Sequence, residues 1–127
     1  MRPNTLMALV AVSALGGFVT SAPAWAQATP RSFAASPDVY KVIAENEQYR
    51  VIAANWKPGQ RDNWHSHGAP VAVYFLTDCT ARIHTPDGKF NDVNPKASGA
   101  SVRAQAPSHS FENVGKADCR MILFEPK

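Results

Sequence analysis

The chain has 127 residues, with 13 Lys or Arg against 10 Asp or Glu, which gives a formal net charge of +3 at pH 7. The basic residues form no cluster, so the sequence lacks the electrostatic footprint of a nucleic-acid-binding or membrane-surface protein. The length is sufficient for a single domain.

The first 26 residues have the pattern of a secretory signal peptide. Arg2 precedes a long apolar run, and Ala24-Trp25-Ala26 has the small-x-small pattern of a signal peptidase site. A transmembrane anchor is the alternative, because residues 5–24 are about long enough to span a bilayer. That run contains Pro23, however, and no basic stop-transfer cluster follows it. We therefore expect a mature chain of 101 residues with a net charge of +2, located in the periplasm or secreted.

The mature chain is predicted to be a flexible polar leader at residues 27–37, followed by one domain at residues 38–127. In this domain, short segments rich in Val, Ile, Tyr, Phe and Trp are each bounded by turn residues. They are 39–44, 49–56, 63–67, 71–76, 80–84, 101–104, 109–113 and 119–124. Turn signals about every 8 to 12 residues, without a helical period, predict an all-β sandwich or barrel.

Two of the four histidines lie one residue apart, at His65 and His67. Residues two apart on a strand point to the same face, so both imidazoles are able to reach one metal ion, with Asn63 beside them. A third ligand must come from elsewhere, and His109 in segment 109–113 is the candidate.

At these histidines the sequence resembles the cupin family. Gly59-x5-His65-x-His67 fits the first cupin motif, G-x5-H-x-H-x3-4-E-x6-G, and His109-x3-Asn113 fits the end of the second, G-x5-P-x-G-x2-H-x3-N. Val71 stands where the family has its glutamate ligand, so the acidic ligand is missing. The resemblance implies a small jelly-roll β-barrel that holds one divalent transition metal ion (iron, zinc, nickel, manganese or copper) through His65, His67 and His109.

Three neutral ligands leave the full charge of a divalent ion in a partly apolar pocket, which favours an anionic or bidentate oxygen ligand. Iron would keep three positions open for a chelating substrate and dioxygen, whereas zinc with a water would suit hydrolysis. The predicted pocket and ligand-orienting residues are Asn63, Val71, Val73, Phe75, Phe111 and Asn113. Asn113 has the alternative role of capping a turn.

The sequence identifies no general base. Glu112 and Tyr74 lie next to the motifs, but strand alternation places both on the face opposite the ligands. The fourth histidine, His84, is expected to face solvent beside Arg82. The catalytic residues therefore stay unassigned.

The two cysteines, Cys79 and Cys119, are candidates for a disulfide in an exported protein. In the jelly roll that the resemblance implies, residues 119–124 pair antiparallel with residues 71–76, which brings the cysteines close together. The bridge would enclose about 40 residues and stabilise the fold by roughly 4 kcal/mol on the loop-entropy interpretation. A redox-active thiol pair or a metal thiolate is the alternative.

Two main hypotheses for the function remain open. The chain is either an exported metal-dependent enzyme acting on a small oxygen-rich substrate, dioxygenase-like in chemistry, or a non-enzymatic periplasmic protein that binds a small molecule or a metal. A third reading treats the histidines as relics in a structural module. The expected partner is a small molecule, and a homodimer is left open.

Overall fold

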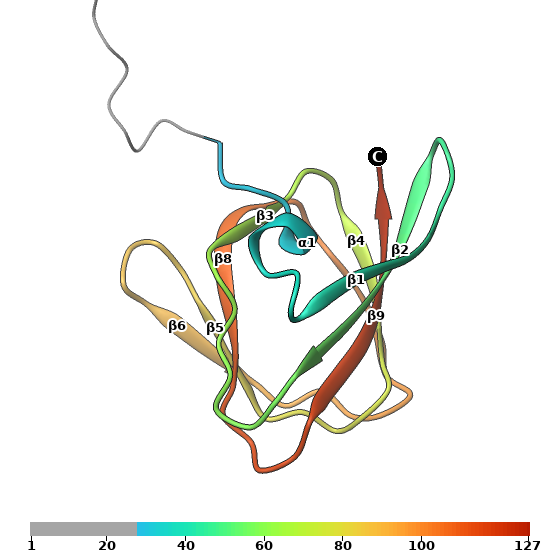
Figure 1. Ribbon diagram of the computed structural model, residues 1–127. Helices are drawn as coiled ribbons and strands as arrows, with labels where there is room; N and C mark the ends of the chain where they lie inside the picture. The colour runs from blue at the N-terminus through green and yellow to red at the C-terminus, as the bar shows by residue number, and fades with distance from the viewer. Residues whose placement is uncertain (1–27) are drawn as a thin grey trace, which may run out of the picture.

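The computed structural model describes residues 28–127, which form two antiparallel β-sheets facing each other (Figure 1). The expected signal peptide lies outside the described residues. One sheet has the strand order β1-β2-β9-β4-β7 and the other the order β3-β8-β5-β6. The elements are α1 (Ser32–Ala35), β1 (Tyr40–Glu45), β2 (Tyr49–Trp56), β3 (His65–His67), β4 (Val71–Phe75), β5 (Ala81–His84), β6 (Phe90–Val93), β7 (Ala100–Arg103), β8 (Ala106–Asn113) and β9 (Cys119–Pro126).

Each of the eight predicted segments overlaps a strand, so the predicted all-β fold is confirmed. Strand β6 was not predicted, because Phe90-Asn91-Asp92-Val93 has no run of apolar residues and the strand is mostly exposed. It pairs antiparallel with β5, and the guanidinium of Arg82 both binds Asp92 and lies over the ring of Phe90. Cross-strand partners, and not a local periodicity, stabilise this edge strand.

The inward-facing residues of both sheets form one core. Burial alternates along β4 and β9, as the two-residue period of a half-buried strand requires. Fully buried side chains such as Ile52 and Trp56 each contribute about 1.5 to 3 kcal/mol through burial of apolar surface. Within residues 28–127 no helix has the length and apolar character needed to cross a membrane.

Part of the segment expected to be a flexible leader is built into the domain. Residues 32–35 form α1, which lies between β1 and β3 (Figure 1). Ser32 and Ser36 are buried, and the hydroxyl of Ser36 accepts a hydrogen bond from the backbone N–H of Asn63 at 2.8 Å. The small polar side chains of this segment gave no apolar pattern, so its packing was not predictable from periodicity.

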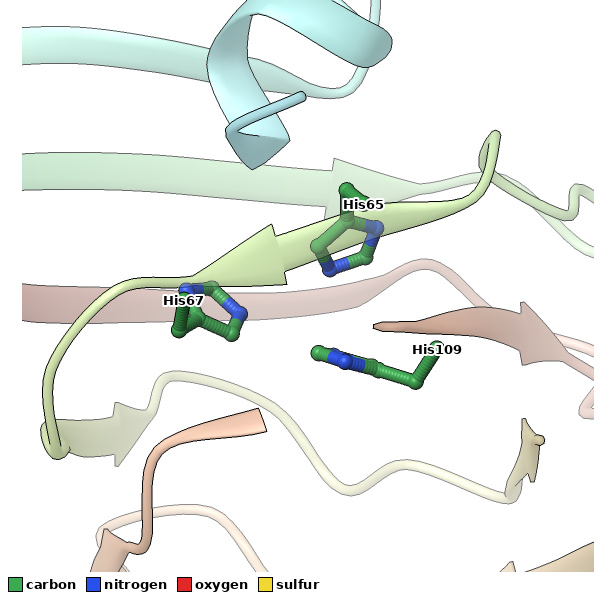
Figure 2. Close-up of side chains that lie close together, drawn as sticks. All are labelled: His65, His67 and His109. Atoms are coloured by element: carbon green, nitrogen blue, oxygen red, sulfur yellow. The ribbon is translucent and has the colours of Figure 1, made fainter. Parts of the chain in front are cut away.

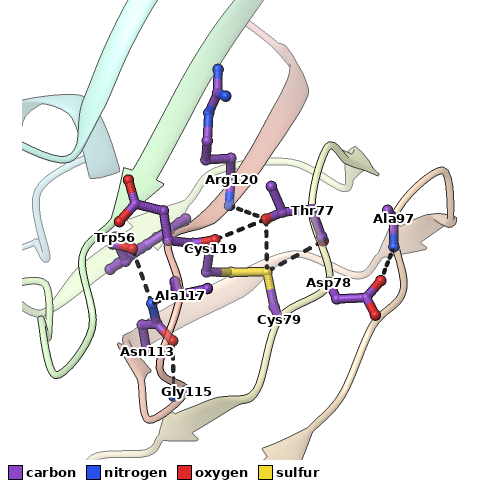
Figure 3. Close-up of a disulfide and its surroundings, with 11 residues drawn as sticks. Trp56, Thr77, Asp78, Cys79, Ala97, Asn113, Gly115, Ala117, Cys119 and Arg120 are labelled. Atoms are coloured by element: carbon purple, nitrogen blue, oxygen red, sulfur yellow. Dashed lines mark hydrogen bonds between the residues drawn. A yellow bond between two sulfur atoms is a disulfide. The ribbon is translucent and has the colours of Figure 1, made fainter.

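The predicted disulfide is present. β4 pairs antiparallel with β9, and Cys79, which follows β4, is bonded to Cys119 at the start of β9, with 5.0 Å between their Cα atoms (Figure 3). The hydroxyl of Thr77 donates to the carbonyl of Asp118 and accepts from the N–H of Arg120. These contacts tie the two chain segments together beside the bridge.

Candidate metal centre

The three histidines of the predicted ligand set come together inside the barrel. His65 and His67 lie on β3 and His109 on the neighbouring β8, where His65 and His109 are direct cross-strand partners. One ring nitrogen from each side chain lies within 4.8 Å of those of the other two. Figure 2 shows the three imidazoles turned toward one another.

An irregularity in the pairing of β3 with β8 accompanies this arrangement. His65 is opposite His109, but His67 is opposite Ala106, so two steps along β3 correspond to three along β8. The extra residue on β8 is a bulge, which bends a strand and re-aims its side chains. The bulge lies directly beside His109.

The backbone fixes the tautomer of His65. Its Nδ1 lies 3.0 Å from the carbonyl oxygen of Asn63. A carbonyl only accepts, so Nδ1 carries the proton and Nε2 keeps the lone pair that a metal needs. The side chain of Asn63, which was expected to orient the ligands, instead donates to the carbonyl of Ala35 and holds α1 in place.

Burial, together with the charges of His65 and His67, lowers the pKa of His109 to about 3. The imidazole is therefore neutral at pH 7, which is the form that binds a metal ion. Three neutral imidazoles are a donor set that suits iron, nickel, copper and zinc. The Nδ1 atoms of His67 and His109 are buried without a hydrogen-bond partner. The residues present thus fit a divalent transition metal ion.

A buried polar group beside His65 was not recognised in the sequence. The Asp62 carboxylate accepts hydrogen bonds from Tyr40 Oη at 2.7 Å, Trp56 Nε1 at 3.1 Å and the N–H of Phe111 at 2.7 Å. Tyr40 Oη also lies 3.3 Å from His65 Nε2. Burial raises the pKa of Tyr40 well above its usual value, and the negative charge of Asp62 adds to this effect. Asp62 lies between the glycine and the first histidine of the motif, where strand patterning carries no signal for burial.

A small cavity lies inside the barrel. Its volume is about 90 Å³, and it is lined by Val73, Phe75, Ile83, Arg103, Phe111 and Met121. Three of these, Val73, Phe75 and Phe111, were predicted pocket residues. The cationic side chain in the lining, Arg103, was not predicted. Arg103 is the direct cross-strand partner of Val71, so both residues lie on the same face of the sheet.

Asn113 has the turn role that was its alternative interpretation. Its side chain is buried and donates to the carbonyls of Trp56 and Ala117, while its Oδ1 accepts from the N–H of Gly115 (Figure 3). These bonds close the connection from β8 to β9. Its described contacts therefore serve that turn and not the histidines.

The outer faces of the sheets carry the three residues that were predicted to point away from the ligands, Tyr74, Glu112 and His84. Tyr74 is 40% exposed. Glu112 is the cross-strand neighbour of Arg82 and lies 2.8 Å from Nε2 of His84. The prediction that His84 is not a ligand agrees with its absence from the histidine cluster.

Neither a protein-family model nor a curated protein sequence matches the chain. Solved structures do. A cupin domain from Bordetella pertussis Tohama I matches with a TM-score of 0.65 and 20% identity, over 78% of this chain and 96% of that one. The chain has the fold of a small single-domain cupin.

Two further solved structures are similar in fold. An RmlC-like cupin family protein with a double-stranded β-helix fold, from Methanocaldococcus jannaschii, has a TM-score of 0.56 and 10% identity, covering 69% of this chain and 78% of that one. A polyketide cyclase from Streptomyces resistomycificus has a TM-score of 0.53 and 17% identity, covering 68% and 63%. At these identities the likeness concerns the fold.

At the position of the glutamate ligand in the cupin motif, this chain has Val71, which is buried. A different carboxylate, Glu125 on β9, reaches the interior and is fully buried. Its Oε1 lies 3.1 Å from Arg31 and its Oε2 lies 3.6 Å from Nδ1 of His67. Burial alone would raise the pKa of Glu125, but His67 and Arg31 outweigh it and bring the pKa below its usual value. Glu125 does not belong to the group of converging metal-binding atoms.

The sequence did hold a signal for Glu125. The alternation of inward residues along β9 runs through Cys119, Met121 and Leu123, and its next member is Glu125. A carboxylate at an inward position of a strand needs a partner.

Proposed function

We propose that this cupin binds one divalent transition metal ion through His65, His67 and His109, and that the ion takes up a small anionic, oxygen-rich ligand inside the barrel. The convergence of three ring nitrogens within 4.8 Å carries the proposal. When bound, such an ion supplies a Lewis acid and, if it is iron, redox chemistry with dioxygen.

The cavity between the two sheets supports an anionic ligand. The cavity lining is apolar except for Arg103. This side chain forms no ion pair with a carboxylate of residues 28–127. A guanidinium in the cavity lining attracts a carboxylate or enolate oxygen, and it is suited to bidentate contact. The apolar walls lower the local dielectric constant and so strengthen that attraction.

The activity that fits these features is that of a metal-dependent oxidoreductase of dioxygenase type. Its substrate would be a small molecule with oxygen atoms on neighbouring carbon atoms. Three protein ligands leave an octahedral ion three free positions, enough for a chelating substrate and dioxygen. The chain's own contribution is to fix the imidazoles, to attract the substrate through Arg103, and to surround it with apolar side chains.

A non-enzymatic binding role is the second candidate, and one observation favours it. Tyr40 and Asp62, the ionisable groups packed beside His65, are hydrogen-bonded to each other. Neither is free to serve as a general acid or base.

One structure with the same fold is a polyketide cyclase, so this barrel is also compatible with chemistry on polyoxygenated molecules.

We place this activity in the periplasm or outside the cell. The Cys79–Cys119 bridge is consistent with an oxidising compartment, and residues 1–26 have the pattern of a secretory signal peptide. Sequencing the N-terminus of the protein recovered from a periplasmic fraction tests this: a start at residue 27 is expected, and an intact Met1 in the cytoplasm contradicts it.

The deciding experiment is elemental analysis of the protein purified without chelators or metal-affinity resin. Near-stoichiometric metal is expected in the wild type and in His84→Ala, the control that removes an outer-face histidine. The metal should be lost in His65→Ala/His109→Ala. No metal in the wild type, even after reconstitution with iron, zinc and nickel, contradicts the proposal.

Dioxygen consumption distinguishes the enzyme role from the binding role. The iron-loaded protein is mixed with small dicarbonyls and hydroxy acids, and dioxygen consumption is followed beside the change in the metal's absorption spectrum. Consumption together with a spectral change supports the oxidoreductase. A spectral change without consumption supports the binding protein.

A further inference from the structure

The Glu125 carboxylate and the His67 imidazole leave two buried polar atoms facing each other. Glu125 has no exposed surface, yet its Oε2 has no hydrogen-bond partner, and neither has His67 Nδ1. The two atoms are 3.6 Å apart. One is an acceptor and the other is able to donate, and a shift of less than 1 Å brings them into a charge-assisted hydrogen bond. Unpaired buried polar atoms are rare in folded proteins, so this pair calls for an explanation.

The other oxygen of Glu125 is held by the N-terminal segment. Arg31 donates to Oε1 at 3.1 Å. The backbone of this segment lies against β3 midway between the two histidines: the N–H of Ser66 donates to the carbonyl of Pro30 at 2.8 Å, and the hydroxyl of Ser66 donates to the carbonyl of Thr29 at 2.7 Å. Arg31 is therefore anchored on the strand that carries His65 and His67.

Gly68, which follows His67 directly, makes room for this arrangement. A Cβ atom built on Gly68 would overlap the guanidinium of Arg31. The backbone of Gly68 does not have a positive φ, so the requirement is for space and not for a special conformation. The guanidinium thus passes over the position where any other residue would carry its side chain, and reaches Glu125 inside the barrel.

We propose that Glu125, held by Arg31, accepts the Nδ1–H of His67 and so is a positioning residue of the metal centre, which makes the N-terminal segment part of that centre. Neutral imidazole carries one proton. Placing it on Nδ1 leaves Nε2 with the lone pair that binds the ion, and the carboxylate makes this nitrogen a stronger donor. The carbonyl of Asn63 does the same for His65. The inference deepens the proposed function and rests on it for the identity of the bound group.

Glu125 is not itself a metal ligand in this proposal. Glu125 lies outside the group of converging nitrogens, behind His67. Its carboxylate therefore acts on the metal through the imidazole. Glu125 does not take the place of the glutamate ligand that Val71 replaces, so the proposed ligands remain the three histidines.

The first test needs no variant and no metal. Long-range ¹H–¹⁵N NMR of the metal-free wild type reports which ring nitrogen of His67 carries the proton. The proposal expects Nδ1–H, and an Nε2–H tautomer of His67 overturns it. This measurement stays informative even if the protein binds no metal, in which case the proposed function fails and the positioning of His67 is still decided.

The second test uses Glu125→Gln, with Glu112→Gln as the matched control. Glu112 is also a glutamate beside an imidazole, that of His84, but on the outer face. A glutamine at 125 keeps the shape and is able to donate its amide N–H to Nδ1, which favours the wrong tautomer of His67. We expect Zn²⁺ affinity to fall by about 10 to 100-fold in Glu125→Gln and to be unchanged in Glu112→Gln.

Gly68→Ala provides an independent variant, since it displaces Arg31 without altering Glu125 or a histidine. A loss of Zn²⁺ affinity together with a weakened Nδ1–H signal of His67 is expected. If Glu125→Gln and Gly68→Ala both fold and both retain wild-type affinity and the wild-type tautomer, the inference is wrong. If Glu125→Gln fails to fold, Gly68→Ala and the wild-type spectrum decide.

Discussion

The Asp62 carboxylate and the Tyr40 hydroxyl lie 2.7 Å apart in the interior of the barrel, beside His65. Asp62 also accepts from Trp56 and from the backbone of Phe111, so a single side chain joins β1, β2 and β8. The Asp62 side chain has no exposed surface. The Asp62 carboxylate therefore holds together the strands around His65. Strand patterning does not predict its burial.

Asp62→Ala is expected to destabilise the protein by about 3 to 5 kcal/mol, because three buried donors lose their acceptor at once. Urea unfolding, followed by tryptophan fluorescence, measures the change. Asp92→Ala is the matched control, since Asp92 accepts from Arg82 in an exposed pair and its removal should change stability little. Equal small effects for the two variants would show that the Asp62 bonds do not stabilise the fold.

Removing the bridge tests the role of the disulfide. The Cys79→Ser/Cys119→Ser variant is expected to lose about 4 kcal/mol of unfolding free energy, because the unfolded chain is released from a loop closed over a separation of 40 residues. Denaturant unfolding of the variant beside the oxidised wild type measures the loss, and the wild type in reductant should follow the variant. A variant as stable as the oxidised wild type would contradict this role.

The fold could be predicted from the sequence because its main determinants are local. Inward and outward residues alternate along β4, and Pro58-Gly59 and similar turn pairs separate the strands. The histidines were predictable for the same reason: the spacing of His65 and His67 fixes a common face, whatever the rest of the chain does.

What could not be predicted depends on contacts between distant segments. Asp62 is buried because Tyr40 and Trp56 meet it from other elements. The inward position of Glu125 follows from the alternation along β9, but its partner Arg31 lies on a distant segment. A single sequence does not tell a charged residue that finds such a partner from one that faces water. The ordered part of the leader could not be predicted for a similar reason, since its packing depends on small residues and backbone hydrogen bonds.

Arg103 is predicted to select anionic ligands. In the Co²⁺-loaded protein, Arg103→Gln should bind a small dicarboxylate about 10-fold more weakly, because a charge-assisted hydrogen bond is lost. A neutral diketone should bind as before. The visible spectrum of cobalt reports both affinities, and Arg82→Gln on the outer face serves as the control. Equal weakening for the neutral and the anionic probe would mean that Arg103 shapes the cavity without recognising charge.

Metal binding should also stabilise the folded barrel. The three histidines converge only when β3 and β8 are paired, so the ion binds the folded state in preference to the unfolded chain. At a free Zn²⁺ concentration of 100 times the dissociation constant, the linkage relation gives about 2.7 kcal/mol of added stability. Thermal unfolding with and without chelator measures the difference. The gain should be retained in His84→Ala and absent in His65→Ala/His109→Ala; a gain that persists in the double variant would place the stabilising ion elsewhere in the molecule.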